Sequence, residues 1–422
     1  MTVLLKNATY IDWKTIEFKT SHILVDEGLD GKIHFLDKID QQDVTETIDC
    51  KGKYVTKSFA VGHHHAYSAL SRGMGAPKKN PENFYEVLKY IWWTLDKCLD
   101  RDMIEYSALV TAIACAKAGS TFVIDHHASP NAVYNSLDIM AKAFEKVGVS
   151  HLLCYEISDR DGADIAEQGL NVTNAYLQNH QGLVGLHASF TVGNDTLQKA
   201  VELMNHFKSG IHVHVAEDFY DQQHSLKTYN NRVVERLNDY GILSSPKTIL
   251  VHCLHINDNE RELIKNANCW IAQNTESNLN NNVGYFKSIG LGERIMLGTD
   301  GMHSNMLQSA KSAFFYGQGF DDIQYSEAYR RFRNVHRYIE SNQFTGDGDN
   351  NLVILDYDTP TEINQSNFLG HFIFGINSNH IAHVISKGKL IVKNRQIQTV
   401  NEEEILKTSR VLASKLWKKM QE

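Results

Sequence analysis

Short apolar runs alternate with amphipathic stretches through the middle of the chain. Eight of these runs have the length of a buried strand: 59–61, 121–125, 151–156, 183–187, 211–215, 248–252, 269–273 and 294–298. Between them, segments such as 102–119 and 132–148 repeat apolar residues at three- and four-residue steps and end in glycine, the usual helix stop. Eight strand–helix alternations predict a parallel (β/α)8 barrel over residues 56–350.

Both flanks of this region have a different pattern. Residues 1–55 and 351–400 contain strand-like pieces separated by Gly, Asn and Asp turn signals. We expect these two segments to form one small β-sandwich domain beside the barrel. Residues 401–422 begin acidic and finish basic, the order that suits a helix dipole, and predict a C-terminal helix. The expected fold class is α/β, a TIM barrel with a small β-sandwich formed from both chain ends.

Charge and composition restrict the classes of partner and location. The 42 Lys and Arg residues are outnumbered by 50 Asp and Glu residues, and no basic stripe is present, so we expect no nucleic-acid partner. The six cysteines lack the spacing of a zinc knuckle or a disulfide framework and fit reduced thiols. Neither a secretory leader pattern nor an eighteen-residue apolar window occurs, so we expect a cytoplasmic protein with no membrane partner.

Histidines and acidic residues gather at the ends of the predicted strands, where barrel enzymes build their active sites. His63 and His65 would point to one face of the first strand, with His64 pointing away. Alone, such a pair is more often hydrogen-bonded than metal-binding. Later strand ends add five more polar side chains: His212, His214, Glu217, His252 and Asp300. Imidazoles with a carboxylate suit one divalent ion, with Zn²⁺ favoured over Fe²⁺ or Mn²⁺.

The same residues resemble a known family. His63-x-His65, His214 three residues before Glu217, His252 within HCLH and Asp300 within TDG resemble the amidohydrolase superfamily, in its cytosine-deaminase-like, mononuclear branch. The strings IWWTLDKCLD, VIDHHASP, HASFTV, HVAEDFYD and NNNVGY are most similar to the SsnA-type aminohydrolases, also called chlorohydrolase-like. The resemblance runs essentially from end to end. It is specific for the superfamily and less specific for the substrate.

The resemblance implies a role for each matched side chain. Four residues match the metal ligands of this branch: His63, His65, His214 and Asp300. Glu217 matches the residue that moves protons to the ring nitrogen, His252 the one that polarises the attacked carbon's substituent or the water, and His187 a substrate contact. Because the fourth predicted strand has no bridging lysine, one cation is expected instead of two.

The chemistry expected of these groups is hydrolytic deamination. A divalent cation lowers the pKa of a bound water from 15.7 toward about 7, so hydroxide is available at neutral pH. We expect Asp300 to take the water's proton, Glu217 to protonate the ring nitrogen and then the leaving group, and His252 to stabilise the tetrahedral intermediate. The predicted small-molecule substrate is an amino-substituted N-heterocycle such as a purine or pyrimidine derivative.

Several side chains have two interpretations. His126 follows the second strand and either lines the pocket or orients a metal ligand. Trp92 belongs to an apolar stripe at helical spacing, which favours core packing over substrate contact. The stripe also contains Phe84, Leu88, Ile91, Leu95 and Leu99. Gln273 stands where many relatives have a pocket-facing histidine, and Lys57-Ser58 where they have Pro-Gly. Both differences weaken any transfer of substrate from the family.

The pattern leaves other functions open. The same metal site could hydrolyse a cyclic amide or remove a different leaving group, chloride included. A third alternative is a metal-binding relative that has lost catalysis. Relatives are commonly dimers or larger, so the resemblance implies a homo-oligomer.

Overall fold

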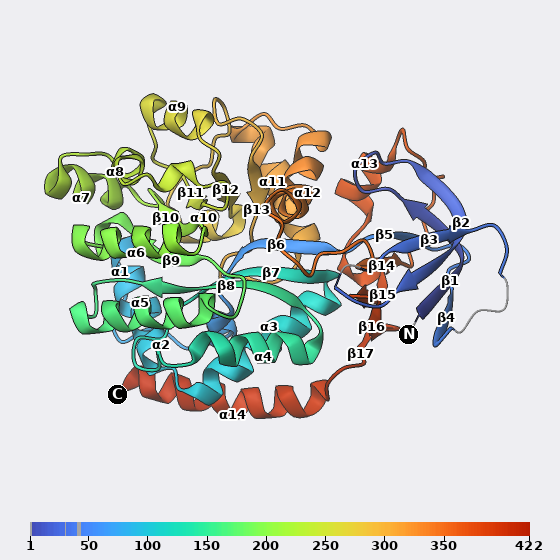
Figure 1. The fold of residues 1–422 in the computed structure, drawn as a ribbon, viewed down its shortest axis with the longest axis horizontal. Coiled ribbons are helices and arrows are strands. Elements are labelled where there is room, and N and C mark those ends of the chain that lie inside the picture. Colours follow the sequence, from blue (N-terminus) through green and yellow to red (C-terminus); the bar gives the residue numbers. More distant parts are fainter. Residues whose placement is uncertain (1, 30, 40–43) are drawn as a thin grey trace.

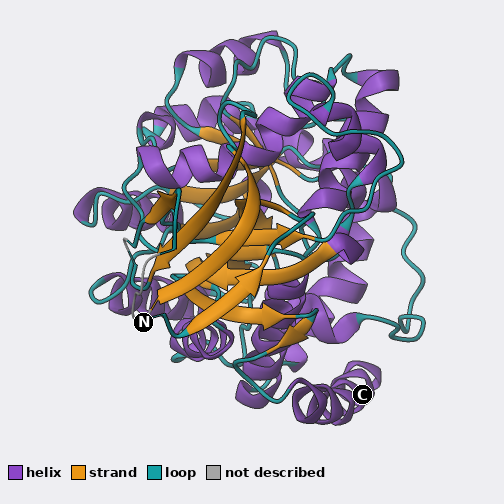
Figure 2. Ribbon diagram, turned by 90° about the vertical axis from the view of Figure 1, so that its right-hand side faces the viewer, coloured by secondary structure: helices purple, strands orange, loops and turns teal. Residues whose placement is uncertain are grey.

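Eight parallel strands form one continuous sheet in the computed structural model, which describes residues 2–29, 31–39 and 44–422. Each of the eight predicted strands is present, in chain order. They are β6 (Phe59–His64), β7 (Ser120–His127), β8 (Ser150–Ile157), β9 (Val184–Ala188), β10 (Ile211–Val215), β11 (Ile249–His252), β12 (Trp270–Gln273) and β13 (Ile295–Leu297). Figure 2 shows the strands at the centre with helices around them, which confirms the barrel.

The sheet closes where its first strand meets its last. Asp300, just after β13, forms a parallel bridge with His64, and the Thr299 amide donates to the His63 carbonyl over 2.9 Å. A Cβ on Gly62 would lie 2.6 Å from the Leu297 carbonyl oxygen, so only glycine allows the two strands to approach this closely. Closure therefore brings the end of β6 beside Asp300.

Helices follow the strands and cover the outside of the barrel. They are α3 (Arg101–Lys117), α4 (Ser136–Val147), α5 (Ala163–Leu177), α6 (Asn194–His206), α7 (Phe219–Tyr229), α8 (Val233–Asp239), α9 (Asp258–Asn266), α10 (Thr275–Asn281), α11 (Met306–Phe320) and α12 (Tyr325–Ser341). Local sequence sets their ends. The Asp100 side chain caps α3 by accepting from the Met103 amide, and Gly148 ends α4 with φ at 93°.

The barrel interior below the strand ends is a packed apolar core, as is usual for this fold. Inward-facing residues from alternate positions of the strands fill it. They include Ala60, Phe122, Ile124, Leu152, Cys154, Ile249, Val251, Ala272 and Met296, all at most 1% exposed. The packed core closes the lower end of the barrel, so a cavity has room only above it, at the carboxyl ends of the strands.

A second sheet is built from both ends of the chain. Its nine strands are β1 (Thr2–Ile11), β2 (Phe18–Asp26), β3 (Ile33–Leu36), β4 (Glu46–Asp49), β5 (Tyr54–Lys57), β14 (Leu352–Leu355), β15 (Ile381–Ser386), β16 (Lys389–Lys393) and β17 (Gln396–Ile397). Strand β5 pairs antiparallel with β14, which joins the two segments. Blue and red strands therefore lie side by side in Figure 1. The predicted separate β unit is confirmed, whereas the exact domain limits, 1–55 with 351–400, 56–350 and 401–422, stay predictions.

The last helix, α14 (Glu402–Gln421), returns from the second sheet and lies along the barrel (Figure 1). Leu412 and Leu416 are buried, and the Trp417 indole donates to the Leu70 carbonyl over 2.8 Å. Shorter helical segments complete the chain: α1 (Phe84–Val87), α2 (Trp93–Cys98), α13 (Phe368–Gly370), η1 (Ala66–Ser71), η2 (Leu88–Trp92), η3 (Ser189–Thr191), η4 (Ile242–Ser244), η5 (His371–Gly375) and η6 (Ser378–His380). Within the described ranges, no helix has the length and apolarity needed to cross a membrane.

Candidate active site

The side chains predicted from the strand ends converge at one end of the barrel. His63 and His65 come from the end of β6, His214 from β10, His252 from β11 and Asp300 from the turn after β13. The middle histidine of the HHH run, His64, points away, with Nδ1 3.5 Å from Asp125 Oδ1 and Nε2 3.1 Å from Ser304 Oγ. The alternation of a strand thus separates His64 from its two neighbours.

The backbone at these strand ends adopts an unusual conformation. Ala216, His252 and Asp300 are non-glycine residues with positive φ values of 46°, 72° and 51°. A residue held in this left-handed region costs of order 1–3 kcal/mol, and such residues cluster at functional sites. The turns after β10, β11 and β13 therefore direct side chains into the space above the barrel at an energetic cost.

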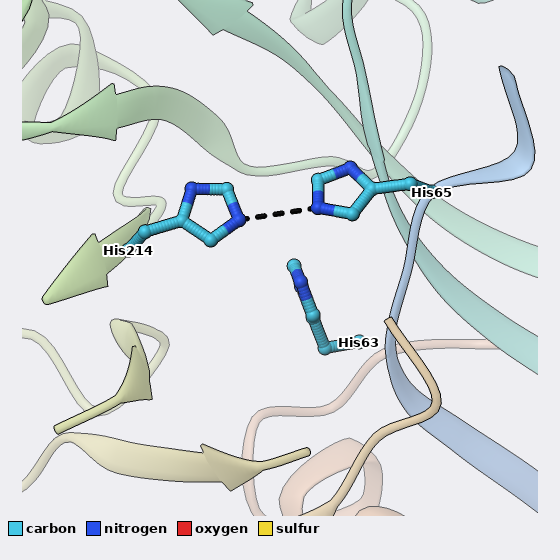
Figure 3. Close-up of side chains that lie close together, drawn as sticks. All are labelled: His63, His65 and His214. Atoms are coloured by element: carbon cyan, nitrogen blue, oxygen red, sulfur yellow. Dashed lines mark hydrogen bonds between the residues drawn. The ribbon is translucent and has the colours of Figure 1, made fainter. Parts of the chain in front are cut away.

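Figure 3 shows the rings of His63, His65 and His214 turned toward one another, with a dashed line for the 3.1 Å contact between the Nε2 atoms of His65 and His214. His65 Nδ1 donates to the His126 carbonyl over 2.7 Å, and His214 Nδ1 donates to the His187 carbonyl over 2.8 Å. In neutral rings these bonds leave lone pairs on both Nε2 atoms, which face each other at 3.1 Å. His63 Nε2 is buried without a hydrogen-bond partner. Converging lone pairs repel one another, so the donor set fits a cation between the three rings.

Asp300 supplies a carboxylate beside these nitrogens. Its Oδ1 lies 3.3 Å from His65 Nε2 and 3.9 Å from His63 Nε2. Burial alone would raise the pKa of Asp300, but the neighbouring His65 and His252 rings, with hydrogen bonds from Ser277 and the Gly301 amide, hold this pKa below its ordinary value. Three imidazole nitrogens and one carboxylate oxygen match the ligands that Zn²⁺, Fe²⁺ and Mn²⁺ accept.

Glu217 also lines the site and lies beside His252, with Oε2 3.4 Å from His252 Nε2. Burial raises the pKa of Glu217 well above its usual value, and the nearby Asp300 carboxylate raises it further, while a hydrogen bond from Asn281 opposes the rise. Glu217 therefore keeps its proton to a higher pH than an ordinary glutamate does. A buried acid of this kind can donate and accept protons during a reaction.

A cavity opens directly above these groups. One wall is apolar and comes from the segment between β6 and α3. It consists of Phe84, Leu88, Trp92 and Trp93. The floor carries His65, His214 and Asp300 with Glu217 and His252, and the rest of the lining includes Tyr67, Glu156, His187, Asn280 and Asn281. An apolar wall beside a few converging polar groups is the usual arrangement of a small-molecule site.

Known proteins resemble this chain along most of its length. The family model described as "Amidohydrolase family" matches residues 59–330, which is most of the chain. The chain belongs to the amidohydrolase family. This amidohydrolase is 26% identical to a 5-methylthioadenosine/S-adenosylhomocysteine deaminase of Aquifex aeolicus, with 93% of this chain and 94% of the relative covered. The predicted superfamily resemblance is thereby confirmed.

Two solved structures share the whole fold of this amidohydrolase at low identity. An adenosine deaminase from Xanthomonas campestris with bound zinc superimposes with a TM-score of 0.83 at 15% identity, covering 98% of each chain. An atrazine chlorohydrolase from Arthrobacter aurescens TC1, in complex with zinc, gives a TM-score of 0.82 at 15% identity, covering 97% of this chain and 100% of that one. Both likenesses confirm the barrel and its accompanying sheet.

His187 lies in the cavity wall at the end of β9. Burial lowers the pKa of His187 to about 3, so the ring is neutral. The Thr191 hydroxyl donates to the Ala188 carbonyl and lies 2.7 Å from His187 Nδ1, so it accepts the proton of that nitrogen. Nε2 of His187 is then free to accept a hydrogen bond within the cavity. Trp92 also reaches the cavity and is half-buried there.

Two residues expected at the cavity lie behind it. His126 is fully buried: its ring Nε2 lies 3.1 Å from the Leu186 carbonyl oxygen, and its own carbonyl accepts from His65. Gln273 points to the outer layer, because its Oε1 accepts from the buried Arg331 guanidinium over 2.7 Å and its Nε2 donates to Thr275. Neither side chain belongs to the cavity lining. The position of His126 suits a residue that orients a candidate metal ligand, His65, and the position of Gln273 suits a structural residue.

The structure adds polar residues that the sequence did not single out. Glu156 lies near the end of β8 and lines the cavity. Burial would raise its pKa, but the neighbouring His187 ring, the Arg160 guanidinium and a hydrogen bond from His126 lower this pKa well below its usual value. The end of the third predicted strand, HLLCYE, could have revealed Glu156 by the rule that revealed the other strand-end residues. Asn278 and Asn281 lie on α10 and follow no recognisable spacing.

Proposed function

We propose that this amidohydrolase is a metal-dependent deaminase of an amino-substituted N-heterocycle of the purine or pyrimidine class. One observation carries the proposal. Glu217, a carboxyl group whose pKa is raised, faces His252 at the same end of the cavity as His65, His214 and Asp300, and His63 is buried next to them. Hydrolytic deamination requires a proton donor, a hydrogen-bond donor and a cation-binding cluster at one place, and the cavity floor offers all three.

Each residue of the floor has a task in this reaction. When bound, a divalent cation supplies the nucleophile by lowering the pKa of water. Asp300 accepts the proton of that water, and Glu217 passes its proton to the ring nitrogen beside the attacked carbon. His252 donates from Nε2 to the attacking oxygen, because Asn278 Nδ2 donates to its Nδ1 over 2.8 Å and leaves the ring proton on Nε2. Glu217 then carries the proton of the new hydroxyl group to the amino group, ammonia leaves as the ring carbonyl forms, and the proton on Asp300 returns to Glu217.

The charges around the cavity favour a substrate without an anionic group. Among the described residues, the lining contains the ionised Glu156 and neither lysine nor arginine. The nearest guanidinium, Arg160, lies behind Glu156 and is already bound by Asp96, Glu156 and Asp161. Burying a phosphate or carboxylate here without a partner would cost several kcal/mol. Neutral bases and nucleosides are therefore the proposed substrates, with nucleotides excluded.

The comparisons support the substrate class and the metal. A relative named for deaminating 5-methylthioadenosine and S-adenosylhomocysteine supports a purine substrate, and two neighbouring structures with zinc support Zn²⁺. The likeness to an atrazine chlorohydrolase supports a second candidate, the displacement of chloride from a chlorinated heterocycle at the same floor. A homo-oligomeric state and a cytoplasmic location stay predictions.

The test is to load the purified protein with Zn²⁺ and measure ammonia release from adenosine, 5-methylthioadenosine, guanine, cytosine and AMP. We expect ammonia from at least one neutral compound and none from AMP, with a product one mass unit heavier than the substrate. Glu217→Gln is the matched control: it should keep the bound zinc and lose turnover by about 10²- to 10⁴-fold. Release of chloride from a chlorotriazine without any ammonia would favour the second candidate. Zinc binding without turnover of any compound would leave only a non-catalytic metal protein.

A further inference from the structure

A row of buried hydrogen bonds runs beneath the site, away from the cavity. His63 Nδ1 lies 2.9 Å from His212 Nε2, and His212 Nδ1 lies 3.5 Å from Cys154 Sγ. The Cys154 thiol in turn donates to the Asp125 carbonyl oxygen over 3.6 Å. His63, His212, Cys154 and Asp125 are each 0% exposed. Water therefore cannot replace any partner in the row.

The direction of these bonds follows from the last member. A carbonyl oxygen only accepts, so Cys154 must use its single proton on Asp125. Burial raises the pKa of Cys154 well above its ordinary value, which keeps that proton on sulfur. The sulfur is then left to accept from His212 Nδ1. A neutral His212 ring has no second proton, so its Nε2 accepts from His63 Nδ1.

The same direction determines which nitrogen of His63 faces the site. With its proton on Nδ1, His63 presents a lone pair at Nε2, the buried atom that has no partner. In the reverse direction, His63 Nε2 would carry a proton pointing at the space shared with the Nε2 atoms of His65 and His214. A cation could not bind there until the row reversed.

His63 differs in this respect from the other two histidines of the cluster. The rings of His65 and His214 are held by backbone carbonyls, and a side-chain substitution does not remove a backbone carbonyl. Only His63 depends on two further side chains for its orientation and its tautomer. A substitution of His212 or Cys154 can therefore change the tautomer of His63.

We propose that Cys154 and His212 are positioning residues, which keep His63 in the tautomer that can bind a cation. This inference rests on the metal site of the proposed function. Partners that orient metal-bound histidines from behind change metal affinity about 10- to 100-fold when they are removed. The thiol of Cys154 acts here as the hydrogen-bond acceptor that a carboxylate or a carbonyl supplies in other metal sites.

The experiment compares Cys154→Ala with Cys154→Ser in the full-length protein. The two replacements leave nearly the same gap in the core, but only serine keeps an oxygen that can accept from His212 and donate to Asp125. We expect the zinc dissociation constant, measured by competition with a chelator, to rise about 10- to 100-fold in Cys154→Ala and to stay near the wild-type value in Cys154→Ser. Nitrogen NMR of histidine-labelled protein without metal should show the proton of His63 moving from Nδ1 to Nε2 only in Cys154→Ala.

A matched control is Cys50→Ala. Cys50 is equally buried, and its sulfur lies 3.9 Å from the Ile48 carbonyl, but it belongs to the second sheet. This variant should leave zinc affinity unchanged. If the wild-type protein binds no zinc, the metal site of the proposed function is wrong. If it binds zinc and both Cys154 variants equal wild type, or if both weaken binding to the same extent, the proposed role of Cys154 is overturned.

Discussion

His252 shows how one hydrogen bond decides the chemistry of a single side chain. Asn278 Nδ2 donates to its Nδ1 over 2.8 Å, and burial lowers the pKa of His252 to about 4, so the ring is neutral with one proton, on Nε2. That nitrogen faces Glu217 at 3.4 Å and Asp300 at 3.8 Å. His252 therefore serves as a hydrogen-bond donor at the site, whereas His65 and His214 present lone pairs.

Asn278→Leu tests this assignment at the scale of one residue. Leucine has a similar size but no donor, so both tautomers of His252 become available and fewer molecules present a proton at Nε2. We expect kcat to fall about 10- to 100-fold while zinc content and the thermal unfolding temperature stay close to wild type. Steady-state kinetics with elemental analysis provides the check. A variant that loses zinc instead would show that Asn278 supports the metal ligands and not the donor.

The sequence revealed the groups that follow a simple rule and missed those that depend on packing. His63, His65, His214, His252 and Asp300 all lie at strand ends, so their convergence could be predicted from the barrel alone. Asn278 and Asn281 reach the site from α10, the helix that follows β12: Asn278 lies 2.8 Å from His252 Nδ1, and Asn281 lines the cavity. Gln273 lies at a strand end too, but the buried charge of Arg331 draws its amide outward.

At the scale of elements, the segment α1–η2–α2 has two functions on one helical stripe. Leu95 and Leu99 are buried in the barrel core at 0% and 3% exposure, while Phe84, Leu88 and Trp92 are half-buried and line the cavity. Helical periodicity predicts that these residues share a face. It does not show where the packed core ends and the cavity begins, because that limit is set by the neighbouring strands.

Paired alanine substitutions on this segment should separate the two functions. Leu95→Ala removes a fully buried side chain and should lower the free energy of unfolding by about 2–5 kcal/mol. Leu88→Ala opens the cavity wall, so we expect a higher KM with a much smaller loss of stability. Urea unfolding and steady-state kinetics of both variants measure the contrast. Equal losses of stability would show that the cavity wall is part of the core.

At the scale of the whole molecule, the second sheet joins strands that are hundreds of residues apart. His383 on β15 lies at this junction, and the Asn394 amide donates to its Nδ1 over 3.4 Å. Burial lowers the pKa of His383, and the positive charges of Lys53 and Lys393 lower it further. The folded protein therefore holds His383 neutral at a pH where the unfolded chain would protonate it.

This shift predicts how acid weakens the fold. Well above pH 6.5, which is about the ordinary pKa of histidine, His383 is neutral in both the folded and the unfolded state and gives no pH dependence. As the pH falls below 6.5, the unfolded state takes up a proton first, so stability is lost. We expect His383→Gln to lose less stability than wild type between pH 7.5 and 5.5 in urea unfolding. His206→Gln, which changes an exposed histidine on α6, should lose as much as wild type.

The pairing of β5 with β14 has a consequence for biosynthesis. Tyr54–Lys57 leaves the ribosome long before Leu352–Leu355, with the entire barrel translated in between. Until the later strand arrives, one edge of the early strands has unpaired backbone groups, and exposed edges of this kind invite association with other chains. The nascent polypeptide thus completes the second sheet only near the end of translation. A chaperone that shields the early strands would bind them after β5 is made and before β14 is made.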